Sequence, residues 1–298
     1  MKFVSYNDCG KENVGILIED SVVPINEIVC LTNGIRINSM IDLIENMNED
    51  LIEILENVVS AANYNFVPVN SIKLLAPIPY PQRNVLCLGK NYEEHAKEIE
   101  ATKISDTGIP DHPIYFTKTA SPAIADGDSI RFSYEAARQV DYEVELAVVI
   151  GKEGVNIKPE DAEDYIFGYT IINDVTARDV QVKHKQWFKA KSMDDFCPMG
   201  PVIVYKKEIP FPVELNIQSR INGELRQNSN TKKLIFNISY IISDLSLGFT
   251  LKPGDIICTG TPSGVGIGFK PPKFLEDGDI IECYIEKIGK LVNKVVVI

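Results

Sequence analysis

The chain has little of the material from which several common kinds of site are built. Its 298 residues include only three histidines, one tryptophan and six cysteines. The cysteines, at positions 9, 30, 87, 197, 258 and 283, form no CxxC pair, and the histidines are too few for a Cys/His zinc site. We interpret the six cysteines as reduced, mostly buried thiols of a cytoplasmic protein.

Long apolar runs and an excess of positive charge are also missing. No apolar stretch approaches the length of a membrane span, and the N-terminus lacks the apolar segment of a signal peptide. Lysine and arginine total 30 against 42 aspartates and glutamates, a net charge of −12. This balance argues against nucleic acid or an anionic membrane as the partner. A hydrophobic content of 45% instead indicates an ordinary globular protein.

Prolines mark one candidate domain boundary. Three prolines between Ala76 and Pro81 predict a stiff, extended connector. We therefore expect a small N-terminal domain over residues 1–75 and a main domain over residues 76–298. Residues 1–38 have the pattern of short strands, and the apolar spacing over residues 39–59 predicts one amphipathic helix that Ser39 caps.

The main domain is rich in predicted strands. Its few helical patterns include residues 239–247, which Gly248 would end. No strand–helix–strand rhythm repeats, and this favours an α+β or β-roll architecture over a doubly wound sheet.

Two glutamates in a predicted strand are the sharpest local feature. Residues 140–150 alternate, so Glu143 and Glu145 project from one face, about 6.6 Å apart at the backbone. Both carboxylates can then reach one divalent ion, which would relieve their repulsion. The alternative is a solvated strand face, because Asp141 continues the row.

Asp174 is a third candidate ligand. It follows a predicted strand over residues 167–172, where loops commonly position functional groups. Alternatively, Asp174 is the N-cap of a helix that contains Ala177 and Gln181.

A histidine and a glutamate form a candidate acid–base pair. His95 and Glu98 are three residues apart in a predicted helix, so the carboxylate can orient the imidazole and raise its basicity. The alternative is an exposed histidine on a charged helix. Residues 93–111 are polar and turn-rich, which predicts a mobile lid.

Two further features have both a functional and a structural interpretation. Lys191, near Trp187, either balances a carboxylate cluster or lies on a surface loop. The glycine-rich segment 260–268 lacks the GK[ST] of a P-loop and the spacing of a dinucleotide fingerprint. Its backbone amides either line an anion site or form a tight turn.

Together these motifs resemble the fumarylacetoacetate hydrolase family, from about Pro77 to the C-terminus. They follow one another in the family's order: GKNY at 89–92 with His95 and Glu98, FTK at 116–118, DYEVEL at 141–146, GYT at 168–170, NDVTARD at 173–179, KS at 191–192, NGELRQ at 222–227 and TGTPSGVG at 259–266.

The resemblance implies a fold and a set of site residues. The fold would be α+β, with a mixed β-roll or sandwich as its C-terminal domain and a small α+β domain before it. One Mg²⁺ or Mn²⁺ per subunit would be bound by Glu143, Glu145 and Asp174. The implied catalytic residues are His95, Glu98 and Lys191, and the implied substrate-binding residues are Arg178, Gln181 and Thr261.

The resemblance also implies a reaction class. The family's namesake has a fourth carboxylate ligand where this chain has Lys90 and Asn91, which favours the bacterial-type branch of acylpyruvases, oxaloacetate decarboxylases and isomerases. We expect metal-dependent cleavage of a C–C bond in a short 2-oxo acid, through a metal-stabilised enolate. The alternatives are an isomerase of a 2-hydroxy-diene dioate in aromatic catabolism and a non-catalytic binding protein. A homodimer formed through the C-terminal domain is implied as well.

Overall fold

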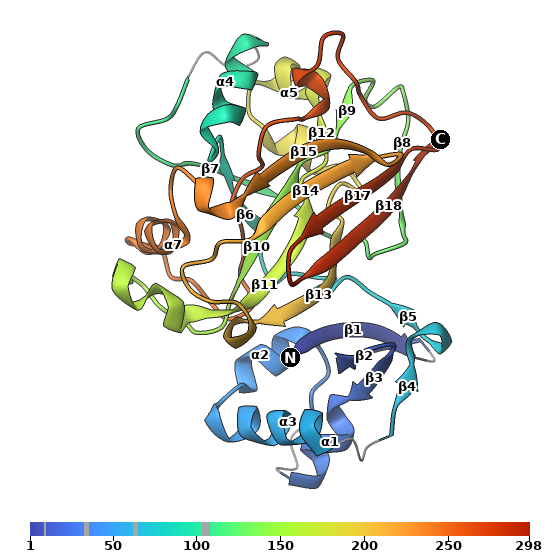
Figure 1. Cartoon of the computed structure of the whole chain (residues 1–298), viewed down its shortest axis with the longest axis vertical. Coiled ribbons are helices and arrows are strands. Elements are labelled where there is room, and N and C mark those ends of the chain that lie inside the picture. Colours follow the sequence, from blue (N-terminus) through green and yellow to red (C-terminus); the bar gives the residue numbers. More distant parts are fainter. Residues whose placement is uncertain (9, 33–35, 62–64, 103–107) are drawn as a thin grey trace.

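The computed structural model describes residues 1–8, 10–32, 36–61, 65–102 and 108–298. Its N-terminal part, in blue in Figure 1, combines a strand meander with helices on one side. These elements are β1 (Lys2–Asp8), β2 (Lys11–Ile18), β3 (Ser21–Pro24), α1 (Ile25–Thr32), α2 (Met40–Asn46), α3 (Glu49–Ala61), β4 (Val67–Pro68), η1 (Val69–Ser71) and β5 (Lys73–Leu74).

Two expectations for this part are wrong. The predicted helix over 39–59 is two helices, because Asn48 starts a new one by accepting a hydrogen bond from the Leu51 amide at 2.9 Å. Ser39 does cap the first, accepting from the Asp42 amide at 3.1 Å. Residues 25–32 are also helical rather than extended, since Ile25, Ile28 and Val29 bury one face at helical spacing.

The largest sheet crosses the predicted domain boundary. Its main-part strands are β6 (Val85–Gly89), β7 (Ile114–Lys118), β10 (Val144–Ile150), β11 (Ile166–Asn173), β13 (Met199–Tyr205) and β16 (Ile256–Cys258). The sheet order is β4-β3-β2-β1-β13-β11-β10-β16-β6-β7, with β5 on β1. Because β1 pairs antiparallel with β13, one hydrogen-bonded sheet joins both parts, and the division at residue 75 stays a prediction.

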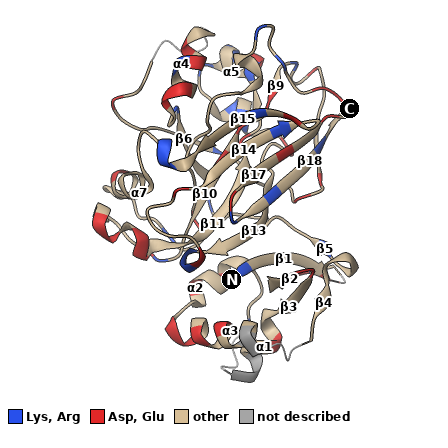
Figure 2. Cartoon of the chain, viewed as in Figure 1, with Lys and Arg blue, Asp and Glu red and all other residues tan. Residues whose placement is uncertain are grey.

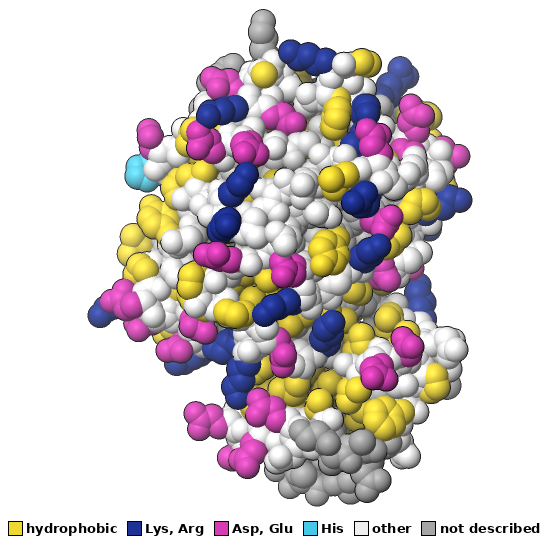
Figure 3. All heavy atoms as spheres, in the orientation of Figure 1, with side chains coloured by type: hydrophobic (Ala, Val, Ile, Leu, Met, Phe, Trp, Pro, Cys, Tyr) yellow, Lys and Arg dark blue, Asp and Glu magenta, His cyan; other side chains and the backbone are white. Residues whose placement is uncertain are grey.

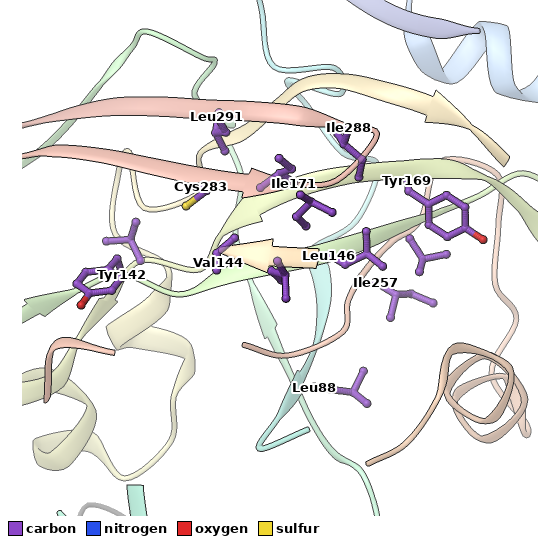
Figure 4. Packing of buried hydrophobic residues seen from close by; sticks show 14 of the residues in the cluster. Leu88, Tyr142, Val144, Leu146, Tyr169, Ile171, Ile257, Cys283, Ile288 and Leu291 are labelled. Carbon is purple, nitrogen blue, oxygen red and sulfur yellow. The ribbon is translucent and has the colours of Figure 1, made fainter. Parts of the chain in front are cut away.

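A second sheet packs against the first. Its strands are β8 (Ser129–Phe132), β14 (Asn216–Ile221), β15 (Glu224–Asn230), β17 (Ile280–Ile285) and β18 (Gly289–Val297), in the order β15-β14-β17-β18-β8. Figure 4 shows Val144, Leu146 and Ile171 of the first sheet facing Cys283 and Leu291 of the second. Parallel pairs (β6–β16 and β8–β18) occur among antiparallel ones, so the sheets are mixed. The predicted α+β class is confirmed.

The remaining elements lie around the two sheets. Helices α4 (Glu93–Ala101) and α5 (Arg178–His184) lie at the end of the molecule far from the N-terminal part (Figure 1). The others are β9 (Val140–Asp141), η2 (Pro159–Tyr165), β12 (Thr176–Ala177), α6 (Phe188–Lys191), η3 (Lys206–Glu208), η4 (Thr231–Lys233), α7 (Ile238–Ser246) and η5 (Gly266–Gly268).

The predicted strand over 140–150 is interrupted. Its first residues form β9, which pairs with β12, and the strand resumes as β10 at Val144. All eleven residues are buried, because β10 is a central strand and the second sheet covers it. The interpretation of its acidic row as a solvated face is therefore wrong.

Charged side chains of both signs lie on the outside of the molecule (Figures 2 and 3). Acidic residues are prominent on α3 and α4 in Figure 2, while residues of both signs are interspersed on the face in Figure 3. Within the described ranges, no helix is both long and apolar enough to cross a membrane. Four cysteines, Cys87, Cys197, Cys258 and Cys283, are buried free thiols as predicted. Cys9 and the side chain of Cys30 lie outside the described residues.

Aromatic packing stabilises the junction of β1 with the main part. The Phe3 ring lies 5.4 Å from the Phe167 ring and 6.2 Å from the Tyr205 ring, centroid to centroid. Phe3 is fully buried. We expect Phe3→Ala to lower the free energy of unfolding by about 3–5 kcal/mol in denaturant titrations. Phe66→Ala is the matched control, since Phe66 is 41% exposed, and it should cost at most about 0.5 kcal/mol. Similar small losses in both variants would contradict this role of the junction.

Candidate functional site

Three carboxylates converge where β10 and β11 lie side by side. Glu143 precedes β10, Glu145 is its second residue, and Asp174 follows the last residue of β11. The antiparallel register places Val144 opposite Asn173, and the Asp174 amide donates to the Glu143 carbonyl at 2.8 Å. One oxygen from each carboxylate lies within 4.8 Å of the others, and all three residues are buried. The predicted convergence of the three is confirmed.

Buried cations hold these carboxylates in place. The Lys191 ammonium donates to Glu143 Oε2 at 2.8 Å and to Asp174 Oδ2 at 2.5 Å. Arg178 Nη2 donates to Glu143 Oε1 at 2.6 Å, and Lys118 Nζ donates to Asp174 Oδ1 at 2.6 Å. Lys191 is 2% exposed, so the surface-loop interpretation of this lysine is wrong. Asp174 is likewise not an N-cap, because α5 begins at Arg178 and its N-cap is Ala177.

Two buried groups of this cluster were not predicted as site residues. Lys118 ends β7, and its ammonium also donates to the Phe196 carbonyl. A lysine that closes an apolar strand was the available signal. Asp141 accepts from Arg178 Nε at 2.9 Å, although its place in the acidic row suggested a solvated side chain. Neither interaction has a local pattern, because Lys118 is 56 residues from Asp174, and Asp141 is 37 residues from Arg178.

The pKa values of the two glutamates are pushed apart. Burial alone would raise the pKa of Glu143, but Lys191 and Arg178 outweigh it and hold that pKa well below the usual carboxyl range. Burial, and then the charges of Asp174 and Glu143, raise the pKa of Glu145. A cation close to Glu145 would therefore stabilise the ionised form of this carboxylate.

The donor set suits a hard divalent cation. Two oxygens that bind one such ion lie at most about 4–5 Å apart, and the oxygens of this triad, all within 4.8 Å of one another, meet that limit. Each carboxylate oxygen has two lone pairs, so those of Glu143 and Asp174 can accept a second partner beside their lysine and arginine bonds. Glu145 Oε2 accepts from the Gly260 amide at 2.8 Å, which fixes this side chain from the glycine-rich segment.

The predicted acid–base pair lies on α4. His95 Nδ1 is 3.1 Å from Glu98 Oε2, and the Gly264 amide donates to Glu98 Oε1 at 3.0 Å. His95 is 5% exposed, so the exposed-histidine interpretation is wrong. Residues 103–107 of the predicted lid lie outside the described part of the chain, and the mobility of residues 93–111 stays a prediction.

One cavity is lined by Glu143 and Glu145 of the triad and by His95 of the pair. Asp174 and Glu98 do not line it but bond to residues that do, Asp174 to Lys191 and Glu98 to His95. Thr261 lies on the wall of this cavity, where its hydroxyl donates to the Val144 carbonyl at 2.9 Å and accepts from Gln227 Nε2 at 2.7 Å. The remaining predicted residue, Gln181, accepts from Arg178 Nη1 at 3.2 Å. Polar and apolar residues both line the cavity: Leu88, Gly89, Lys90, His95, Ile99, Phe116, Glu143, Glu145, Arg178, Gln181, Trp187, Lys191 and Thr261.

Comparison with known proteins identifies the family. The family model described as "Fumarylacetoacetate (FAA) hydrolase C-terminal" matches residues 84–296. The chain is 52% identical over 227 residues to oxaloacetate tautomerase YisK of Bacillus subtilis, covering 76% of this chain and 74% of that protein.

Solved structures agree over the whole length. A fumarylacetoacetate hydrolase from Exiguobacterium antarcticum has a TM-score of 0.83 at 38% identity, with all of both chains covered. A maleylpyruvate hydrolase from Sphingobium sp. SYK-6, in complex with manganese(II) and pyruvate, has a TM-score of 0.78 at 29% identity, with 99% of both covered. The cavity, its acidic triad and these matches lead to one conclusion: the chain belongs to the fumarylacetoacetate hydrolase family.

Proposed function

We propose that this enzyme is a divalent-metal-dependent tautomerase that interconverts the enol and keto forms of a short 2-oxo dicarboxylate such as oxaloacetate. The observation that carries the proposal is one cavity lined by Glu143 and Glu145 of the triad together with His95 of the His95–Glu98 pair. The 52% identical relative is named an oxaloacetate tautomerase, which favours isomerisation over the C–C cleavage that the sequence led us to expect.

The triad would hold Mg²⁺ or Mn²⁺. When bound, such an ion supplies Lewis acidity toward the oxygens of a 2-oxo acid. The cations Arg178 and Lys191 line the same cavity, and they attract the substrate carboxylate and the negative charge that develops on its C2 oxygen. Leu88, Ile99 and Phe116 form an apolar wall that limits the access of water.

His95 would move the proton at C3. Its Nδ1 is occupied by Glu98, which leaves Nε2 as the nitrogen for proton transfer. Ketonisation adds one proton to C3 and releases one from the C2 hydroxyl, so no water is consumed and no carbon–carbon bond breaks. The Glu98 carboxylate holds the imidazole in one orientation, so the same nitrogen can give and take the proton in both directions of this exchange.

Hydrolysis of an acylpyruvate is the second candidate. It is favoured by the similarity to the maleylpyruvate hydrolase whose structure contains manganese(II) and pyruvate. In this reaction His95 would activate water rather than protonate carbon. Assays of one preparation with enol-oxaloacetate and with acylpyruvates separate the two candidates.

The first prediction of this proposal concerns His95. His95→Gln keeps a polar side chain but removes the proton carrier, so kcat for oxaloacetate tautomerisation should fall about 10²–10⁴-fold with a small change in KM. The loss of enol absorbance measures the rate. His112→Gln is the control, because His112 is exposed and outside the cavity, and its rate should match that of the parent. Equal rates for all three proteins would contradict the proposed role.

The second prediction concerns the metal. Glu145→Gln should weaken Mn²⁺ binding in calorimetry by a factor of 10 or more, on the order of the effects seen for supporting residues of metal sites. The metal-free variant should remain folded, because the amide keeps an oxygen for the Gly260 amide and removes repulsion from Asp174 and Glu143.

Glu282→Gln is the control for this measurement. Glu282 pairs with Lys290 at 2.9 Å on the second sheet, away from the triad. Its Mn²⁺ affinity and its EDTA-sensitive activity should equal those of the parent. Unchanged affinity in Glu145→Gln would rule out the triad as the metal site.

We also infer a homodimer formed mainly through the main part of the chain. The family resemblance supports it, and so do apolar side chains left exposed there, among them Val182, Phe188 and Leu247. Sedimentation at micromolar concentration should give twice the 33.2 kDa mass of the chain. A single 33.2 kDa species would contradict this assembly.

A further inference from the structure

Asp141 is a fully buried carboxylate to which the mechanism above gives no role. Its Oδ1 accepts from the Gly266 amide at 2.6 Å and from the Tyr142 amide at 2.9 Å. Its Oδ2 accepts from the Ile267 amide at 3.1 Å and from Arg178 Nε at 2.9 Å. A carboxylate usually accepts about four hydrogen bonds, and all four are made here. Asp141 therefore fixes both Arg178 and the loop of residues 264–268.

Arg178 transmits this restraint to the acidic triad. Its Nη2 donates to Glu143 Oε1 at 2.6 Å while its Nε is held by Asp141. Because a guanidinium is planar and rigid, a bond at Nε sets the direction in which Nη2 points. Asp141 therefore determines how Arg178 meets Glu143.

The other end of the loop contacts the acid–base pair. The Gly264 amide donates to Glu98 Oε1, and Glu98 Oε2 lies within hydrogen-bond distance of His95 Nδ1. A Cβ at Gly266 would lie 2.3 Å from the Lys273 carbonyl oxygen, and one at Gly268 would lie 2.1 Å from Glu98 Oε1. The absence of a Cβ lets Gly266 lie close to Asp141 and to the Lys273 backbone, and lets Gly268 lie close to Glu98.

We propose that Asp141 is a positioning residue that acts through residues 264–268. It couples the packing of helix α4 against these residues to the orientation of Arg178 and Glu143. Asp141 holds the loop where the Gly264 amide meets Glu98, and the same carboxylate orients Arg178. Loss of Asp141 then loosens α4 and misdirects Arg178 together. The inference rests on the proposed function, in which the His95–Glu98 pair on α4 and the acidic triad act in the same reaction.

Amide hydrogen exchange of metal-free protein tests the coupling. In Asp141→Asn, the amides of α4 should exchange about 10-fold faster or more, because a contact that seats the helix is lost. The kcat of the metal-loaded enzyme should fall about 10–100-fold, as for other residues that orient metal ligands. Unchanged α4 exchange in a folded Asp141→Asn protein would overturn the proposal.

Asp255→Asn is the matched control. Asp255 is also a buried carboxylate, 4% exposed, that pairs with an arginine (Arg83 Nε, 3.1 Å) and accepts from a backbone amide (Lys252, 2.7 Å). It lies outside the cavity lining. Its variant should leave α4 exchange and kcat unchanged, whatever it does to global stability. A rise in α4 exchange equal to that of Asp141→Asn would show a general loss of stability and overturn the proposal.

Gly268→Ala disturbs the same network of contacts at Glu98 rather than at Asp141. The added methyl group meets only the flexible end of Glu98 at the closest distances, so the chain can fold while Glu98 shifts. The Gly266 and Ile267 amides, which Asp141 holds, should then exchange faster although Asp141 is intact. Unchanged exchange at these two amides would overturn the coupling even where Asp141→Asn fails to fold.

The double variant tests whether Asp141 and Gly268 affect the exchange of α4 through the same set of contacts. Asp141→Asn with Gly268→Ala should raise α4 exchange no more than the larger single change, whereas multiplied effects would mean independent contacts and would overturn the proposal. Exchange in metal-free protein does not depend on turnover. Coupled exchange in an enzyme without tautomerase activity would therefore refute the proposed function and leave the coupling in place.

Discussion

The structure of the site depends on how buried negative charge is balanced. Burying ionised groups is costly unless each is paired and hydrogen-bonded. Here, Lys118, Arg178 and Lys191 bond to Asp141, Glu143 and Asp174. The pKa of Glu145 is raised by burial and by its acidic neighbours. A divalent cation beside Glu145 would stabilise its ionised form, which gives the folded chain an electrostatic reason to bind one.

The same charges explain why the surrounding elements are arranged as they are. Pairing of β10 with β11 brings Glu145 together with Glu143 and Asp174, which adjoin the paired ends of these strands. Asp141 connects Arg178 to the loop on which Glu98 rests, so the triad and the acid–base pair share one network of hydrogen bonds. Rigid strands thus hold the triad, while α4 carries the group that moves the proton.

The sequence predicted the parts of the site that have short-range patterns. Glu143 and Glu145 are two residues apart at the start of β10, and His95 and Glu98 are three apart on a helix, so these short spacings indicated which side chains lie together. Lys118 and Asp141 were missed because their partners come from distant strands and helices, which no local period records. The helix break at Asn48 was missed for a different reason. The apolar spacing continues through this point, but the Asn48 side chain caps a new helix there. The resemblance to a family supplied the roles, and these could not be read from spacing alone.

The central claim is that the chain builds a metal site from these three carboxylates. Diffraction from crystals grown with Mn²⁺, recorded at the manganese absorption edge, tests it directly. The account predicts one anomalous peak per chain, with oxygens of Glu143, Glu145 and Asp174 about 2.0–2.6 Å from it. A map at saturating Mn²⁺ without a peak there, in which Lys191 alone bridges Glu143 and Asp174, would contradict it.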